Sequence, residues 1–140
     1  MAKFIGLDVG SKTIGIAVSE GYFAKTHSTI NFTENNFLEA SEKFNEFLKN
    51  NSYKKIIVGY PKNMDGSIGH RVKMVEEFLT QLYEICQVST EKVVKIDERL
   101  TTRFARAILI EANLSRKKQK ANKDQLAAQL ILETFLQQNK

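Results

Sequence analysis

The first third of the chain consists of short apolar or alternating runs that predict extended strands. Three runs carry this pattern, at residues 3–9, 13–19 and 23–32. In the second run Ile14, Ile16 and Val18 share one face, while Gly15 and Ala17 share the other and leave room for close packing. Because only a three-residue turn separates the first two runs, we expect them to pair as an antiparallel hairpin.

Further along the chain the apolar residues recur at helical spacing. This spacing predicts helices over about 36–49, 71–85, 101–112 and 123–136. Thr101 or Thr102 is suited to cap the third helix. Two short apolar runs, 56–59 and 93–97, predict buried strands between the helices.

The resulting order, β-β-β-α-β-α-β-α-α, predicts one α/β domain over residues 1–140. The first three strands should be antiparallel. The last two, each reached through a helix, should lie parallel to the first strand. We therefore expect a mixed five-stranded sheet with helices on its faces.

An aspartate interrupts the first apolar run. Asp8 lies among Ile5, Leu7 and Val9, in a segment suited to the centre of a sheet. An ionised carboxylate in such a place is costly unless it is paired or bound to a cation. Asp8 could instead cap the tight turn that follows it, but a capping acid need not lie within an apolar strand.

Two further acids lie at the ends of other elements. Glu98 directly follows the strand 93–97, and Asp124 lies in the first turn of the last helix. An acid in a first turn is also favoured by the helix dipole. Asp97 and Glu98 point to opposite faces of an extended chain, so only one of them can join a cluster. The strand pattern leaves open which one it is.

The carboxyl ends of parallel strands meet at one edge of a sheet, where ligand sites collect. Asp8, Gly59 and Glu98 all lie at such ends and should converge. Three carboxylates from separate elements suit Mg²⁺ or Mn²⁺, which take oxygen ligands and support phosphodiester hydrolysis in two-metal sites. A chain with only His27 and His70 argues against a histidine-rich zinc site.

The chain carries a net charge of +5, and the excess lies mainly between residues 95 and 123. That window holds nine lysines or arginines and three acids, which favours a polyanionic partner such as nucleic acid. Candidate residues for contacting nucleic acid are Lys12, Asn63, Arg71, Arg99, Arg116, Lys117, Lys118, Lys120 and Lys123. The sequence has no apolar stretch suited to a membrane, and a single cysteine, Cys86, which indicates a soluble protein of the reducing cytoplasm. We expect the stripe Leu79, Leu82 and Ile85 of the second helix to be buried, and Cys86 beside it to be a buried structural thiol.

Four motifs, in order along essentially the whole chain, resemble the YqgF/RuvX family. They are Gly6–Gly15 with Ala17–Ser19, Val58–Pro61 with Asn63–Gly66, Asp97–Thr102, and Lys123-Asp124 with Ala127-Ala128. The resemblance implies a ribonuclease H-like fold, related to Holliday junction resolvases. It also implies a nuclease that processes the 5′ end of pre-16S ribosomal RNA. By the same resemblance Asp8, Glu98 and Asp124 would be the catalytic, metal-binding acids.

The expected function is therefore a Mg²⁺- or Mn²⁺-dependent nuclease acting on structured RNA, as a monomer or homodimer. Three alternatives differ in substrate or class. A resolvase acting on branched DNA would use the same acids in a dimer. A non-catalytic RNA-binding assembly factor would keep the fold alone. An actin-like ATPase would need a second lobe, for which 140 residues leave no room.

Overall fold

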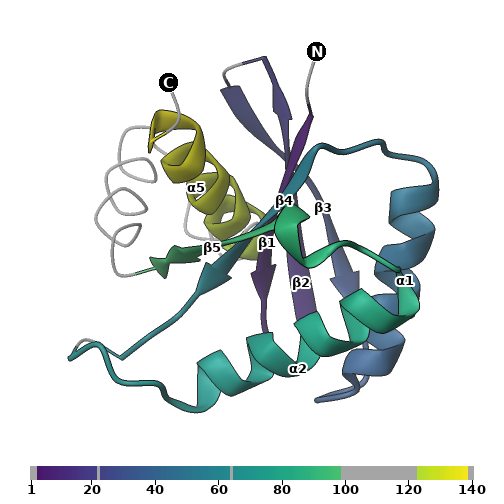
Figure 1. Ribbon diagram of the computed structural model, residues 1–140, viewed down its shortest axis with the longest axis vertical. Coiled ribbons are helices and arrows are strands. Elements are labelled where there is room, and N and C mark those ends of the chain that lie inside the picture. The colour runs from purple at the N-terminus through teal and green to yellow at the C-terminus, as the bar shows by residue number, and fades with distance from the viewer. Residues whose placement is uncertain (1–2, 22, 64, 99–122, 139–140) are drawn as a thin grey trace.

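The computed structural model describes residues 3–21, 23–63, 65–98 and 123–138 (Figure 1). A single five-stranded sheet with the order β3-β2-β1-β4-β5 forms its centre. The strands are β1 Phe4–Val9, β2 Thr13–Glu20, β3 Phe23–Asn31, β4 Lys55–Tyr60 and β5 Val93–Asp97. β1, β2 and β3 are antiparallel neighbours, whereas β4 lies parallel to β1 and β5 parallel to β4. The mixed sheet predicted from the sequence is therefore confirmed.

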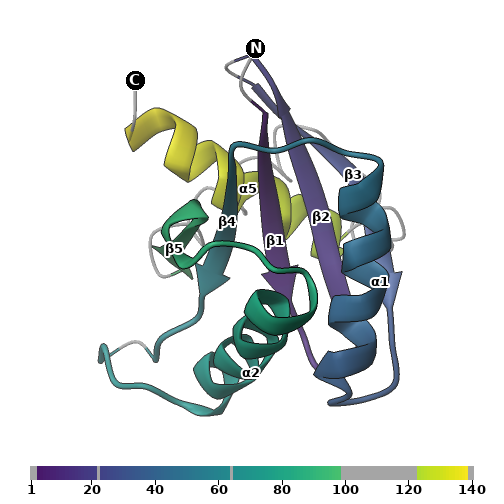
Figure 2. The ribbon, with the colours of Figure 1, turned by 45° about the vertical axis from the view of Figure 1, so that its right-hand side comes forward.

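Helices cover both faces of this sheet. They are α1 Phe37–Lys49, α2 His70–Ile85 and α5 Lys123–Gln138, with a 3₁₀ turn, η1 Thr90–Lys92, before β5. Turning the molecule shows α1 and α2 on one side of the sheet and α5 on the other (Figure 2). No helix of the described residues has both the length and the apolar character that crossing a membrane requires.

Alternation along β1 divides its side chains between two hydrophobic cores. Ile5, Leu7 and Val9 are buried beneath α1 and α2. The intervening positions, which include Gly6 and Asp8, belong to the side of the sheet that α5 covers. On that side the core is built from residues of α5 and the strands, namely Ala17, Ala24, Ile57, Ile96, Ala128, Ile131, Leu132 and Phe135. Asp8 is thus the charged position on the α5 side of the central strand.

The predicted boundaries agree with the structure within about two residues wherever the chain is described, although η1 was not predicted. One core prediction was wrong: Ile85, at the end of α2, is exposed, and Val88 beyond the helix is buried instead. Cys86 is partly rather than fully buried, and this burial raises the pKa of its thiol to about 11. The helix expected over 101–112 and the basic loop up to Lys123 lie outside the described residues.

Candidate active site

Three acids reach the α5 side of the sheet from three different elements. Asp8 is the penultimate residue of β1, Glu98 directly follows β5, and Asp124 is the second residue of α5. β1, β4 and β5 are parallel, so their carboxyl ends lie at the same edge of the sheet. The sequence-based expectation that Asp8, Gly59 and Glu98 converge is met, as their contacts show.

Asp8 and Glu98 are in direct contact. Burial of the Asp8 carboxyl, followed by the charge of Glu98 and a hydrogen bond shared with it, raises the pKa of Asp8 from 3.8 to about 8. The charge of Asp124 raises this pKa further, and Arg71 opposes the shift. Asp8 therefore keeps its proton at neutral pH, because ionising it would place a second negative charge beside Glu98 in a desolvated site.

Gly59 makes the room that the Glu98 carboxyl occupies. A Cβ on Gly59 would lie 2.2 Å from Glu98 Oε1, so any larger residue would displace this carboxyl. Gly59 is paired in register with Ile96, whose side chain belongs to the α5-side core. Glu98, two residues after Ile96, therefore falls on the α5 side, where it contacts Asp8. This placement decides between Asp97 and Glu98, which the strand pattern had left open.

Asp124 lies above the hairpin formed by β1 and β2. Gly15 pairs in register with Asp8, and a Cβ on Gly15 would lie 2.0 Å from the backbone oxygen of Asp124. The first turn of α5 therefore rests directly on the residue opposite Asp8. The Asp124 carboxylate is held by the first residue of β2, since Thr13 Oγ1 donates a 2.9 Å hydrogen bond to Asp124 Oδ2. The role of Thr13 was not predicted, because its partner lies 111 positions away in the sequence.

The donor set of this site suits a hard divalent cation. Asp8 and Glu98 offer adjacent carboxylate oxygens, and a Mg²⁺ ion commonly takes one or two carboxylates and completes its shell with water and substrate phosphate. A bound cation would also relieve the crowding of charge that raises the pKa of Asp8. Within the described ranges, no three His, Cys, Asp or Glu side chains form a ready-made metal cage. Asp124 is close enough for its charge to affect Asp8, but it does not complete such a cage.

Four of the candidates for nucleic-acid contact lie in the described residues, and one of them, Arg71, lies beside an acid of the site. Lys12 follows Asp8 in the β1–β2 turn, and Lys123 precedes Asp124; both are exposed. Arg71, at the start of α2, is exposed, and its Nη2 lies 3.8 Å from Glu98 Oε2. Because the Arg71 side chain is exposed to solvent, the attraction between Arg71 and Glu98 is weak.

Asn63 belongs to the loop between β4 and α2, where the side chains bind one another. Its Nδ2 donates to Ser67 Oγ at 3.1 Å, and Ser67 donates to Asp65 Oδ1 from both its backbone nitrogen and its hydroxyl. The loop is thus ordered by its own polar residues. The other predicted contacts, Arg99, Arg116, Lys117, Lys118 and Lys120, lie outside the described residues.

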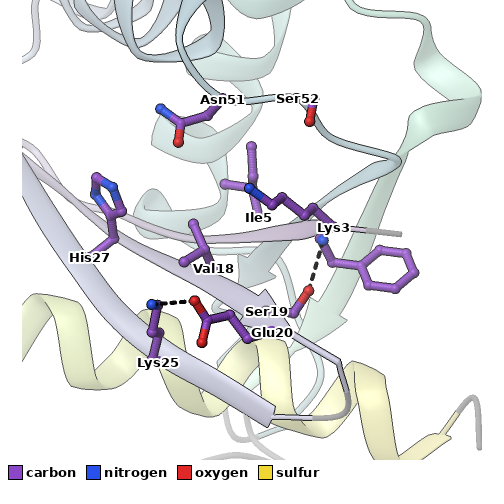
Figure 3. Close-up of a pocket in the computed structure, with 10 residues that line it drawn as sticks. Lys3, Ile5, Val18, Ser19, Glu20, Lys25, His27, Asn51 and Ser52 are labelled. Carbon is purple, nitrogen blue, oxygen red and sulfur yellow. Dashed lines mark hydrogen bonds and ion pairs between the residues drawn. The ribbon is translucent and has the colours of Figure 1, made fainter. Parts of the chain in front are cut away.

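A separate pocket of about 180 Å³ lies at the amino end of β1, the opposite end of that strand from Asp8 (Figure 3). Lys3, Lys25 and His27 line it, but Lys25 is already paired with Glu20 at 2.5 Å. The Ser19 hydroxyl in its wall accepts a hydrogen bond from the backbone of the strand beside it. The pocket shares no residue with the acid site.

Known proteins match this chain over nearly its whole length. A family model described as "RuvX: Holliday junction resolvase" matches residues 2–138. A protein of Mesoplasma florum is 51% identical over 142 residues, which cover 100% of this chain and 99% of that protein. A protein of Mycoplasma capricolum is 45% identical, with 99% of this chain and 97% of that protein covered. Both carry the name "Putative pre-16S rRNA nuclease".

Among solved structures, Thermus thermophilus RuvC in complex with a Holliday junction substrate matches with a TM-score of 0.57 at 13% identity. The match covers 99% of this chain and 96% of RuvC. At this identity the likeness concerns the fold, and it confirms the ribonuclease H-like architecture.

Proposed function

The chain belongs to the RuvX family, and from this membership we propose that it is a metal-dependent nuclease that processes the 5′ end of pre-16S ribosomal RNA. The reaction is hydrolysis of a phosphodiester bond. The whole of residues 1–140 acts as one nuclease domain in the cytoplasm, as a monomer or a homodimer. The observation that carries the proposal is the contact between Asp8 and Glu98, with Asp124 nearby, at the carboxyl edge of the parallel strands.

In this proposal Asp8, Glu98 and Asp124 are the catalytic acids and the ligands of Mg²⁺ or Mn²⁺. The bound cation would supply an activated water and stabilise charge on the leaving oxygen. The contribution of the protein is positional. Burial and the charge of Glu98 keep Asp8 protonated at neutral pH, and a cation bound at the Asp8–Glu98 pair would favour the ionised form of Asp8.

Basic side chains near the acid site would hold the substrate. Lys12 and Lys123 are exposed and lie within four residues of Asp8 and Asp124 in the sequence, and the exposed guanidinium of Arg71 lies beside Glu98. Arginine and lysine bind backbone phosphates whatever the RNA sequence, so these residues would position an RNA strand. The structure of the RNA would then determine which substrate is bound.

A second candidate function is resolution of branched DNA, which the description of the matching family favours. This function needs two sites in a dimer, because two strands of a four-way junction must be cut. It predicts paired nicks on a junction and a dimer in solution. The nuclease chemistry and the acids would be the same.

The two functions are separated by incubating the purified protein with end-labelled precursor RNA and with a four-way DNA junction, in Mn²⁺, Mg²⁺ or EDTA. We expect metal-dependent cleavage of the RNA near the mature 5′ end. Asp8→Asn, Glu98→Gln and Asp124→Asn should each abolish it without loss of fold. Asp97→Asn is the matched control, since it removes the same charge one residue from Glu98.

Cleavage of the junction alone would replace RNA with branched DNA as the substrate. RNA binding without metal-dependent turnover would instead indicate an assembly factor. Wild-type rates in Asp8→Asn would show that the acids have been assigned wrongly.

A further inference from the structure

Three contacts seat the first turn of α5 on the strands beneath it. The backbone of Asp124 lies against Gly15, as described above. Thr13 Oγ1 donates to Asp124 Oδ2 at 2.9 Å, and Gln125 Nε2 donates to Thr29 Oγ1 at 3.1 Å. Two neighbouring residues of α5 are therefore each held by a threonine, one on β2 and one on β3. Only the bond from Thr13 engages a carboxylate.

Thr13 forms hydrogen bonds to the turn that follows Asp8 and to the side chain of Asp124. Its backbone oxygen accepts a 2.8 Å hydrogen bond from the Gly10 nitrogen, which closes the turn that follows Asp8. Its side chain at the same time donates to Asp124. One residue thus fixes the path of the chain leaving the first acid and the carboxylate orientation of another.

A carboxylate on a helix surface rotates freely about its side-chain bonds unless a donor fixes it. The hydroxyl of Thr13 occupies one of the two oxygens of Asp124 and so sets the direction of the other. Partners of this kind, which bind a ligand side chain and not the metal, typically contribute 10- to 100-fold to metal affinity or activity.

We propose that Thr13 is a positioning residue that orients the Asp124 carboxylate toward the divalent cation and substrate phosphate at the Asp8–Glu98 pair. This role rests on the proposed nuclease function. Thr13 does not itself touch the reacting atoms. It acts through Asp124, whereas Thr29 anchors the same helical turn without touching an acid.

The test compares Thr13→Val, Thr13→Ser and Thr29→Val in the full chain. Valine keeps the shape of threonine and removes the hydroxyl, and serine keeps the hydroxyl. Mn²⁺ affinity is measured by titration calorimetry, and the melting temperature is measured in EDTA and in Mn²⁺. Metal-dependent cleavage of the precursor RNA is followed in parallel.

We expect Thr13→Val to weaken Mn²⁺ binding about 10- to 100-fold and to reduce the melting-temperature rise that Mn²⁺ produces. Thr13→Ser should restore most of both. Thr29→Val should lower the melting temperature in EDTA about as much as Thr13→Val, with unchanged Mn²⁺ affinity.

Equal Mn²⁺ affinity in Thr13→Val and Thr29→Val would overturn the positioning role and leave a structural anchor. In that case the wild type still binds Mn²⁺ and cleaves RNA, so the proposed function stands. A wild type that neither binds Mn²⁺ nor cleaves would overturn the function, and the role of Thr13 with it.

Discussion

Replacing Asp8 by asparagine should stabilise the metal-free protein at neutral and alkaline pH and change it little near pH 4. The pKa of Asp8 is raised to about 8 in the folded chain, against an ordinary value of 3.8, chiefly by burial and then by Glu98. Between these two pH values the folded state binds more protons than the unfolded state. The free energy of unfolding therefore falls as the pH rises through this window.

The magnitude follows from the shift. Each pKa unit corresponds to about 1.4 kcal/mol, so at pH 7 the ionisable Asp8 costs the folded state up to about 4 kcal/mol. This is an upper bound, because the surrounding chain and solvent can relax around an ionised Asp8. Asparagine has nearly the same shape and does not ionise. The difference between variant and wild type should therefore grow from near zero at pH 4 to several kcal/mol at pH 8.

The assay is urea unfolding of wild type and Asp8→Asn in EDTA at half-unit steps from pH 4 to pH 8. Taking the difference cancels the titration of the groups that do not interact with Asp8. Glu20→Gln is the control of opposite sign, since a hydrogen bond from Lys25 lowers the pKa of the exposed Glu20. Its small contribution is present at neutral pH and is lost as the pH falls.

Adding Mg²⁺ at pH 8 should narrow this difference in stability. At about 100 times its dissociation constant, a ligand bound only by the folded state adds about 2.7 kcal/mol. Wild type should gain this and Asp8→Asn should not. In EDTA, a stability difference that is independent of pH, or a wild type more stable than Asp8→Asn at pH 8, would refute the electrostatic reasoning.

Three further experiments test the glycine contacts at the site, the interface with RNA and the burial of Cys86. Gly15→Ala places a methyl group against the backbone of α5 and should lower the free energy of unfolding, measured in urea, by about 3 kcal/mol. In Gly59→Ala the methyl group meets the movable end of the Glu98 side chain, so the loss of stability should be smaller, although cleavage should still be abolished. Equal losses of stability in the two variants would contradict this. Arg71→Gln should weaken RNA binding and reduce the slope of log affinity against log salt concentration by about 1. Filter binding measures this slope, and an unchanged slope would show that Arg71 does not contact the RNA. Iodoacetamide at pH 8 should alkylate Cys86 at least about 100-fold more slowly than a free thiol, because the raised pKa of Cys86 leaves little thiolate. Mass spectrometry follows the labelling, and rapid alkylation would contradict the burial of this thiol.

Much of this architecture could be predicted because strand order and parallel crossovers follow from the pattern of short apolar runs and helices. The sheet edge that gathers Asp8 and Glu98 is a consequence of that topology. The choice between Asp97 and Glu98 was beyond the sequence pattern, since alternation separates two faces without saying which one α5 covers. Packing of Ile96 against that helix decides it. Ile85 was wrongly expected to be buried because helical spacing does not show where the supporting core ends.

The acids come together because α5 approaches the sheet more closely than ordinary side chains allow. At Gly6 an added Cβ would lie 2.8 Å from the Ala128 oxygen, and at Gly15 it would lie 2.0 Å from the Asp124 oxygen. The close approach brings the first turn of α5 within reach of Thr13 and places the charge of Asp124 where it acts on Asp8. Packing distance and site chemistry therefore depend on the same glycines. A substitution that widens this contact should impair metal binding even when the chain still folds.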